Sequence, residues 1–257
     1  MKIIELPQEK YFNVRNFFNV DYPNLAFVLA VIEQKIPGRI FVDIENNPTT
    51  CLVLCSGLPY CFIAGEFNRE VFTNFLLILK EKVFVKLICP FSSTKEQINL
   101  TAYGFEPIER LQYRYKDGSK IQDCAGNSEF DLIPVHSEET FSLCNWYSFM
   151  TSMYGNPENY LKNCIGLTLW DREKRRVASE AHGVIAENLI EIGTITNEEY
   201  RGKHLSTIVC NKLIRESIKQ GLHPIWTCDK ANIASWKVAE NQGMDDKMEY
   251  TFYSFKN

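Results

Sequence analysis

The sequence predicts a mixed α/β fold in which strands and helices alternate along two successive halves of the chain. Three observations support this prediction. Apolar residues alternate in short runs, as in strands, and recur at i, i+3 and i+4 in longer runs, as in helices. The runs follow a similar order in both halves. Each half also closes alike, with AYGFEPIERLQYRYK near the middle of the chain and NQGMDDKMEYTFYSF near its end.

The second half is predicted to run in the order β-α-β-β-β-α-β-α-β. Its strands are expected at residues 130–135, 166–170, 177–182, 189–196, 224–229 and 249–255. A first helix is expected over residues 137–154. The spacing of apolar residues over 205–218 predicts an amphipathic helix, which Gly221 ends. Asn232 is expected to cap a last helix that ends at Gly243.

The first half contains the same kinds of runs. Helices are expected at residues 24–34, 68–82 and 93–103, and strands at residues 39–44, 50–55, 60–64 and 83–89. Gly104 and Gly243 each follow a helix and precede an acidic turn and an aromatic strand. These parallels indicate a tandem duplication. The polar stretch 116–128 is the expected linker, which gives domains at residues 1–118 and 129–257.

Composition narrows the classes of partner. The chain has 257 residues, of which 45% are hydrophobic and 23% charged, as in soluble globular proteins. A net charge of −4 argues against a nucleic acid and is mildly better suited to an amine-bearing small molecule. The apolar runs at 27–32 and 72–79 are too short to cross a bilayer, and the N-terminus lacks the apolar core of a secretory signal. We therefore expect no membrane partner and a cytoplasmic location.

The nine cysteines do not form a recognisable framework. They lie in strand-like runs or on helical faces, without a C-x-x-C pair and without a histidine at metal-ligand spacing. Buried free thiols are the expected state, and no metal site is predicted.

The segment EYRGKHLS, which follows the strand LIEIGTIT, has the composition of an anion site. The first backbone N–H groups of a helix lack internal partners and lie at the positive end of the helix dipole. Arg201 and Lys203 add positive charge where this helix begins. The alternative is a basic helix start that only contacts solvent.

Together, EYRGKHLS, LIEIGTIT and NIASWKVAENQGM resemble the Gcn5-related N-acetyltransferases (GNAT). That family carries Arg/Gln-x-x-Gly-x-Gly/Ala at the pyrophosphate loop and an Asn-initiated helix that ends in Gly-Phe. Arg201 matches the leading Arg, His204 the first Gly and Ser206 the Gly/Ala, while Asn232 matches the Asn. The resemblance covers residues 131–255. Neighbouring segments further resemble the branch that contains zwittermicin A resistance-type acetyltransferases.

This resemblance implies a tandem GNAT-like fold whose C-terminal half binds acetyl-CoA as co-substrate. In the family, backbone groups of the strand before the loop contact the thioester. The implied binding residues are Ile192, Thr194, Ile195, Thr196, Arg201, Gly202, Lys203, His204, Leu205, Ser206, Asn232 and Ser235. If His204 and Ser206 both lie in the first helical turn, their φ angles are negative and replacing glycine costs only space. We expect the loop to be functional.

The corresponding loop of the first half is AGEFNREVF. Glu66 and Glu70 flank Arg69 there, and carboxylates would repel a pyrophosphate. The first half is therefore expected to be a degenerate GNAT-like domain that helps to shape the acceptor pocket without binding CoA.

Three residues are candidates for proton transfer. Glu191 occupies the place where many family members carry a base, although it could instead pair with a cation or face solvent. Glu180 and His182 share one face of the preceding strand, where they could bind or deprotonate an amine; a structural role is equally open.

The family often uses a Tyr in the last helix to protonate the thiolate, and Ala239 stands at that position. Tyr250 and Tyr253 are near in sequence without a feature that places them at the sulfur. Cys228 is expected in the core.

The sequence thus predicts an N-acetyltransferase that acts on a small amine. One alternative is a catalytically silent acyl-CoA-binding or sensor module, which the missing Tyr and altered loop favour. Another is a purely structural interaction protein, which only the first half favours. The identity of the acceptor and the oligomeric state are left open.

Overall fold

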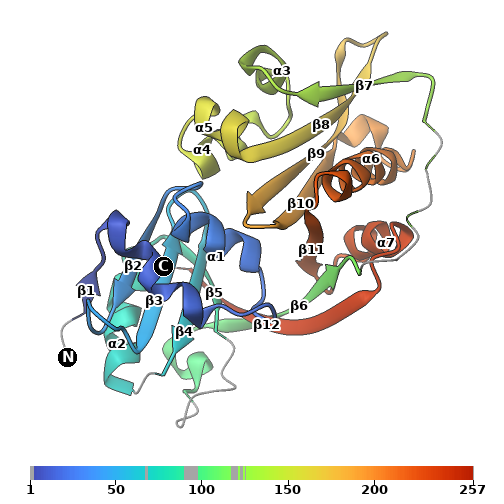
Figure 1. Cartoon of the computed structure of the whole chain (residues 1–257). Coiled ribbons are helices and arrows are strands. Elements are labelled where there is room, and N and C mark those ends of the chain that lie inside the picture. The colour runs from blue at the N-terminus through green and yellow to red at the C-terminus, as the bar shows by residue number, and fades with distance from the viewer. Residues whose placement is uncertain are drawn as a thin grey trace. The chain divides into compact units, whose positions relative to one another are not determined.

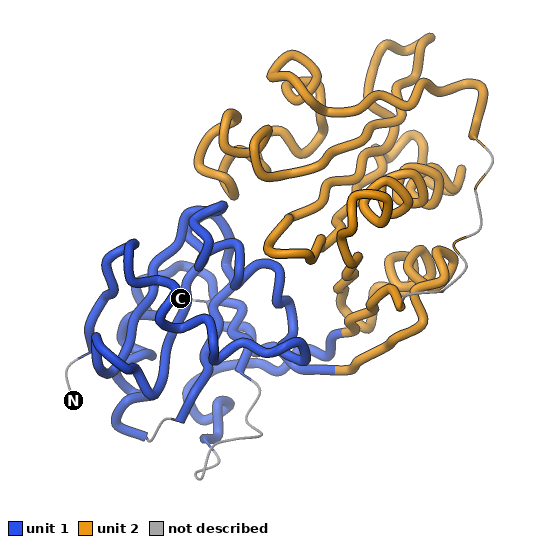
Figure 2. The backbone as a smooth tube through the Cα atoms, viewed as in Figure 1, with its two compact units in different colours: residues 1–110, 250–257 blue, residues 111–249 orange. Residues whose placement is uncertain are grey.

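The computed structural model describes residues 3–66, 69–89, 98–116, 121, 124 and 126–256 (Figure 1). The chain forms two compact units, Met1–Arg110 with Tyr250–Asn257, and Leu111–Glu249 (Figure 2). This division differs from the expected ranges 1–118 and 129–257. The last strand, β12 (Asp246–Lys256), leaves the second unit at residue 249 and pairs with β5 (Phe84–Ile88) of the first. Hydrogen bonds between segments that are distant in sequence decide this boundary. The composition of the linker therefore does not indicate where the boundary lies.

The first unit is a mixed sheet with helices. Its strands are ordered β1-β2-β3-β4-β5-β12, antiparallel except for the parallel pair β4–β5. The remaining strands of this unit are β1 (Ile4–Glu5), β2 (Gly38–Val42), β3 (Thr50–Cys55) and β4 (Tyr60–Gly65). Its helical segments are η1 (Gln8–Phe17), α1 (Leu25–Ile32), α2 (Arg69–Leu79) and η3 (Leu100–Tyr103).

Most expected elements of the first half are present. The sequence of α1, LAFVLAVI, is apolar all round because seven of its eight residues are buried. The 3-10 helix η1 is an element that the sequence analysis missed. Of the helix expected at 93–103, residues 93–97 lie outside the described part, and Leu100–Tyr103 form a 3-10 turn.

The second unit contains the strand order β6-β11-β10-β9-β8-β7, and β6 belongs to it from residue 111 onward. All neighbouring pairs from β7 to β10 are antiparallel, whereas β10 and β11 are parallel. The strands are β6 (Glu106–Arg114), β7 (Phe130–Val135), β8 (Cys164–Asp171), β9 (Arg176–Ala186), β10 (Leu189–Thr196) and β11 (His223–Asp229). Strands β7, β8, β10 and β11 lie close to the ranges expected from the sequence, whereas β9 was expected to end at residue 182 and no bounds were given for β6.

Helix α6 (Leu205–Lys219) packs along β8, β9 and β10 (Figure 1). Its apolar side forms one core with Ala181, Ile190 and Ile192. We call this side of the sheet the α6 face. Helix α7 (Ile233–Asn241) packs on β11 and contributes Val238 to the same core. Both helices end as expected, at glycines with positive φ.

The single helix expected over 137–154 is wrong. The chain forms α3 (Glu138–Ser142) and α4 (Tyr147–Tyr154), separated by a turn, and then α5 (Pro157–Asn163). The turn persists because a buried carboxylate of β9 binds its backbone, as described below. Helix α5 was missed although its signal is present: the Asn156 side chain accepts from the Asn159 N–H at 2.8 Å, and proline follows at the first helical position.

Candidate active site

Strands β10 and β11 separate in the middle of the second unit. Both strands lie wholly within the described residues, and their parallel pairing covers only Leu189–Glu191 of β10 and His223–Ile225 of β11. Each strand then continues for several residues. Beyond Glu191, the backbone N–H and C=O groups of β10 on the side of β11 therefore do not pair with β11.

A groove of about 480 Å³ lies along the separated part of β10, between the beginnings of α6 and α7. Ten of the twelve residues expected to bind acetyl-CoA line it: Thr194, Ile195, Thr196, Arg201, Gly202, His204, Leu205, Ser206, Asn232 and Ser235. The other two do not. Ile192 is buried in the core beneath α6, and the Lys203 ammonium lies 5.6 Å from the ring centre of Tyr200.

The loop before α6 has two residues in the left-handed region. Gly202 has φ +81°, and a Cβ built on it would meet nothing within 4 Å. His204 has φ +58° and is the N-cap of α6, so it lies before the first helical turn and the condition for a negative φ is not met at this residue. Ser206 does lie in the first helical turn. Replacing glycine by His204 therefore costs backbone strain as well as space.

The start of α6 suits an anion. The His204 side chain makes no capping hydrogen bond, so it leaves the first-turn N–H groups of α6 to other acceptors. The Arg201 side chain is 63% exposed and lies 3.3 Å from the Glu198 carboxylate. At the neighbouring helix, Asn232 accepts from the Ser235 N–H at 3.2 Å and so caps α7, as expected.

Tyr200 fixes this loop to the sheet. Its side chain is buried, and its hydroxyl donates to Asp171 at the end of β8 at 2.7 Å. Burial, together with the neighbouring Asp171 carboxylate, raises the pKa of Tyr200 to about 12. The Lys174 backbone N–H and then the Tyr200 hydroxyl lower the pKa of Asp171.

Glu191 lies at the point where β10 and β11 separate. Its side chain is 4% exposed, and one carboxylate oxygen accepts a hydrogen bond from the hydroxyl of Thr227 on β11. Glu191 pairs with Val184 and Ile225, whereas its neighbours Ile190 and Ile192 lie in the α6 core. Since successive strand residues alternate, Glu191 projects to the opposite side, which we call the α4 face.

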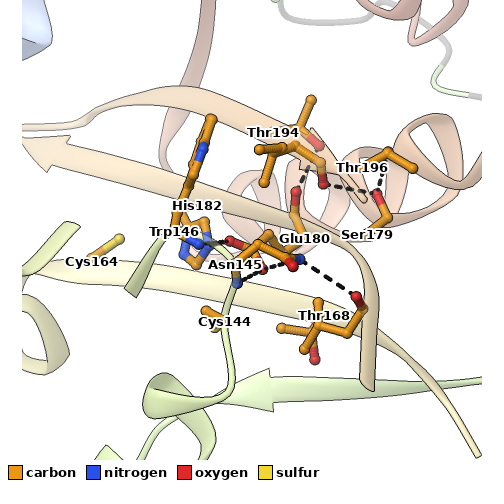
Figure 3. A network of polar contacts seen from close by, with 12 residues as sticks. Cys144, Asn145, Trp146, Cys164, Thr168, Ser179, Glu180, His182, Thr194 and Thr196 are labelled. Atoms are coloured by element: carbon orange, nitrogen blue, oxygen red, sulfur yellow. Dashed lines mark hydrogen bonds and ion pairs between the residues drawn. The ribbon is translucent and has the colours of Figure 1, made fainter. Parts of the chain in front are cut away.

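The carboxylate of Glu180 is enclosed by the turn between α3 and α4 (Figure 3). It accepts from the backbone N–H of Asn145 at 2.7 Å, from the Asn145 amide at 3.1 Å and from the backbone N–H of Trp146 at 2.8 Å. The His182 ring nitrogen Nε2 is 3.2 Å away. Glu180 thus caps α4 from another element, an arrangement that favours negative charge at the helix N-terminus.

His182 continues this network. Its Nδ1 is 2.7 Å from the hydroxyl of Tyr160, whose ring stacks on Phe141 at 3.7 Å. Neither the His182 nor the Glu180 side chain is exposed. Both residues therefore have structural partners within the protein. A role in amine binding or proton removal would require a side chain that a substrate can reach, and these two side chains are enclosed.

The same network includes a group of metal-ligand type. One atom each of Cys144, Glu180 and His182 lies within 4.8 Å of the others. Burial and then the Glu180 carboxylate raise the pKa of the Cys144 thiol, so it favours the protonated form that binds metals poorly. The Glu180 oxygens are also already acceptors. The absence of a metal site stays a prediction.

Trp146 and Thr227 are site residues that the sequence analysis missed. A Cβ on Gly193 would lie 3.1 Å from the indole of Trp146, so this indole covers the backbone of β10 two residues beyond Glu191. A glycine inside LIEIGTIT is the signal that could have indicated the close approach. No comparable signal marks Thr227, because its role depends on the pairing of β10 with β11.

The last helix lacks a tyrosine at the groove. Ala239 is fully buried in the core, and Cys228 lies in the same core, as expected. Tyr250 and Tyr253 belong to the first unit: the Tyr250 hydroxyl donates to Asn24 at 2.6 Å, and Tyr253 pairs with Leu87.

In the first half, the loop AGEFNREVF is described only in part. Residues 67 and 68 lie outside the described part, and Arg69 is the first residue of α2. Glu70 lies in the first turn of that helix. The expectation that this half does not bind CoA stays a prediction.

Two parallel strands that separate beside an uncapped helix start form the frame of an acetyltransferase of the GNAT class. The GNAT acetyltransferase family model matches residues 18–253, and the chain belongs to this family. It is similar to the uncharacterized N-acetyltransferase YdfB of Bacillus subtilis (strain 168), with 23% identity over 265 residues that cover 97% of each chain.

Solved structures show the same fold. A GCN5-related N-acetyltransferase-like protein from Streptococcus suis 89/1591 matches with a TM-score of 0.70 and 23% identity, over 95% of this chain and 98% of that one. A tandem GNAT protein from the clavulanic acid biosynthesis pathway matches with a TM-score of 0.60 and 10% identity, over 99% and 98%. The tandem GNAT-like fold expected from the sequence is confirmed. Among the described residues, every helix is too short or too polar to span a membrane.

Proposed function

We propose that this chain transfers the acetyl group of acetyl-CoA to the amine of a small molecule, and that the second unit carries the reaction. The observation that carries the proposal is the groove beside β10. Ten residues expected to hold acetyl-CoA line it, although the expectation rested on sequence alone. We further propose that the first half is the degenerate copy and that the protein acts in the cytoplasm, where free thiols such as its nine cysteines persist.

The residues at the groove fit acetyl-CoA. A pyrophosphate needs N–H donors, positive charge and space for close approach. The start of α6 offers first-turn N–H groups without a side-chain cap, Arg201 stands exposed beside them, and the space next to Gly202 is open. The open edge of β10 at residues 194–196 offers backbone groups to the remainder of the molecule.

Acetyl-CoA supplies an activated acyl group that an unprotonated amine can attack. The protein must therefore hold the thioester against β10 and accept a proton from the amine. Glu191 belongs to the last residue pair before the strands separate, and we assign it the role of base, acting directly or through one water. The enclosed partners of Glu180 and His182 support leaving them out of this step.

A catalytically silent acyl-CoA-binding module is the second candidate. The observation that favours it is Ala239, which is fully buried where many family members carry the tyrosine that protonates the thiolate. Incubation with acetyl-CoA and a panel of primary amines, followed by release of free thiol, separates the two. Amine-dependent thiol release supports the transferase, and tight binding of acetyl-CoA without release supports the silent module. Absence of binding contradicts both.

A further inference from the structure

We propose that Ser235 takes the place of the missing tyrosine, by donating a hydrogen bond to the sulfur of CoA as the acetyl group leaves. This inference rests on the proposed function. It concerns a residue that the sequence analysis expected only to contact the cofactor.

The first observation is the state of the Ser235 hydroxyl. Trp226 donates its indole N–H to Ser235 Oγ at 3.1 Å, which uses the hydroxyl as an acceptor. Among the described residues, the hydroxyl donates to no protein group. The side chain is half-buried and lines the groove, so its proton is available to a ligand there.

The second observation is the level of Ser235 along the strands. The last paired residues of β10 and β11 are Glu191 and Ile225, and Trp226 is the next residue of β11. The Ser235 hydroxyl therefore binds the side chain of the first β11 residue beyond the paired segment. On β10, residues 194–196, which the proposed function offers to acetyl-CoA, also lie beyond that segment and line the groove together with Ser235.

The third observation is that the two candidate groups lie on opposite faces. Trp226 is part of the α6 core, and α7 packs over β11 on that side. Glu191 projects to the α4 face, where Thr227 binds it. A base on one face and a hydrogen-bond donor on the other suit a displacement in which the amine approaches from the α4 face and the sulfur leaves toward α7.

Glu191 accepts a proton of the amine as the new nitrogen–carbon bond forms. The carbon–sulfur bond breaks, and its electron pair remains on sulfur. Ser235 keeps its proton and stabilises the resulting thiolate by a charge-assisted hydrogen bond, and solvent protonates the sulfur after release. Ala239 lies one helical turn further along α7, and its side chain has no polar atom that could donate a hydrogen bond to the sulfur.

The titration of bound CoA tests the proposal without turnover. The ultraviolet absorbance of the thiolate is followed against pH for the complex with CoA, and the same curve for desulfo-CoA is subtracted, which removes the cysteines and tyrosines of the protein. In the unmodified protein, the pKa of the bound thiol should lie below that of free CoA. Ser235→Ala should raise it by about one unit, a tenfold change in thiolate fraction, and Ser235→Thr should not.

Trp226→Phe is the matched control, because it removes the partner of Ser235 and keeps the hydroxyl. Its complex should titrate like the unmodified one even if the protein melts earlier. An equal shift in Ser235→Ala and Trp226→Phe, or an unshifted thiol in the unmodified complex, would overturn the role of Ser235 while leaving CoA binding in place. A protein that binds neither CoA nor desulfo-CoA would contradict the proposed function itself.

Turnover gives the second readout. Ser235→Ala should lower kcat by about 10- to 100-fold with little change in the KM for acetyl-CoA, because the hydrogen bond forms with charge that exists only after the bond to sulfur weakens. Ser206→Ala, which removes a hydroxyl at the start of α6, should instead change affinity for CoA and leave the thiol titration as it was.

Discussion

The carboxylate of Glu180 on strand β9 accepts a 2.8 Å hydrogen bond from the backbone N–H of Trp146, the N-cap residue of helix α4. A strand residue therefore caps a helix whose N-cap lies 34 residues earlier in the chain. Because Trp146 also covers Gly193 of β10, this bond connects the position of α4 to the strand at the groove.

Glu180→Gln should destabilise the protein. The amide keeps one acceptor but places an NH₂ group among N–H donors, so the free energy of unfolding should fall by about 1–3 kcal/mol. Urea denaturation measures it, and the exposed Glu139→Gln on α3 is the control, with a change within about 0.5 kcal/mol. A large loss of kcat without loss of stability would restore Glu180 to the mechanism.

Acetyl-CoA should raise the melting temperature, since a ligand that binds only the folded state stabilises it. At a free concentration about 100-fold above Kd, we expect a shift of about 5–10 °C. Arg201→Glu should abolish the shift, and Arg69→Glu, at the start of α2 in the first half, should retain it. Equal loss in both variants would contradict the assignment of the active half.

His204→Gly should stabilise the protein by about 1 kcal/mol, because glycine adopts the left-handed conformation of this N-cap without the strain that a side chain brings. His204→Ala is the control, since alanine removes the ring and keeps the strain. Urea denaturation compares the two. If alanine stabilises the protein as much as glycine, the destabilisation comes from the imidazole ring and not from backbone strain.

The hydrogen bond between the Tyr200 hydroxyl and the Asp171 carboxylate predicts that the loop before α6 loses stability at acid pH. The Lys174 backbone N–H and the Tyr200 hydroxyl lower the pKa of Asp171 in the folded protein, so the stabilisation is present above the unfolded value of about 3.9 and is lost as pH falls through the lower folded value. The melting temperature should decrease below about pH 4. Tyr200→Phe should make this decrease shallower, and an identical slope in both proteins would contradict the coupling.

Glu191→Gln should lower turnover by about 10²–10⁴ and leave affinity for CoA nearly unchanged, because the amide keeps the shape and removes the basicity. The defect should shrink at high pH, where free amine is plentiful. Steady-state kinetics across pH and a CoA titration measure both effects.

Thr227→Val is the matched variant for Glu191, because it removes the hydroxyl that binds the carboxylate and keeps the carboxylate itself. It should retain more turnover than Glu191→Gln. If Glu191→Gln melts earlier, keeps most of its turnover and shows no pH dependence of the loss, then Glu191 only steadies the strand.

The sequence by itself determined the elements around the groove. The strand LIEIGTIT, the amphipathic helix that follows and the Asn232 cap all lie where local pattern indicates. These features depend on residues close together in the chain: alternation sets a strand, apolar spacing sets a helix, and one side chain caps its own next turn. The ten expected residues that line the groove lie in or beside such elements, and their binding of acetyl-CoA stays a prediction.

Tertiary structure alone decided the rest. The turn that divides residues 137–154 exists because Glu180 binds it, and β12 divides between the units because β5 offers an edge. The roles of Thr227 and Ser235 depend on which strand lies beside β10 and on where those strands separate. Hydrogen bonds between different helices and strands fix each of these features, and no pattern of neighbouring residues encodes such bonds because their partners come together only on folding.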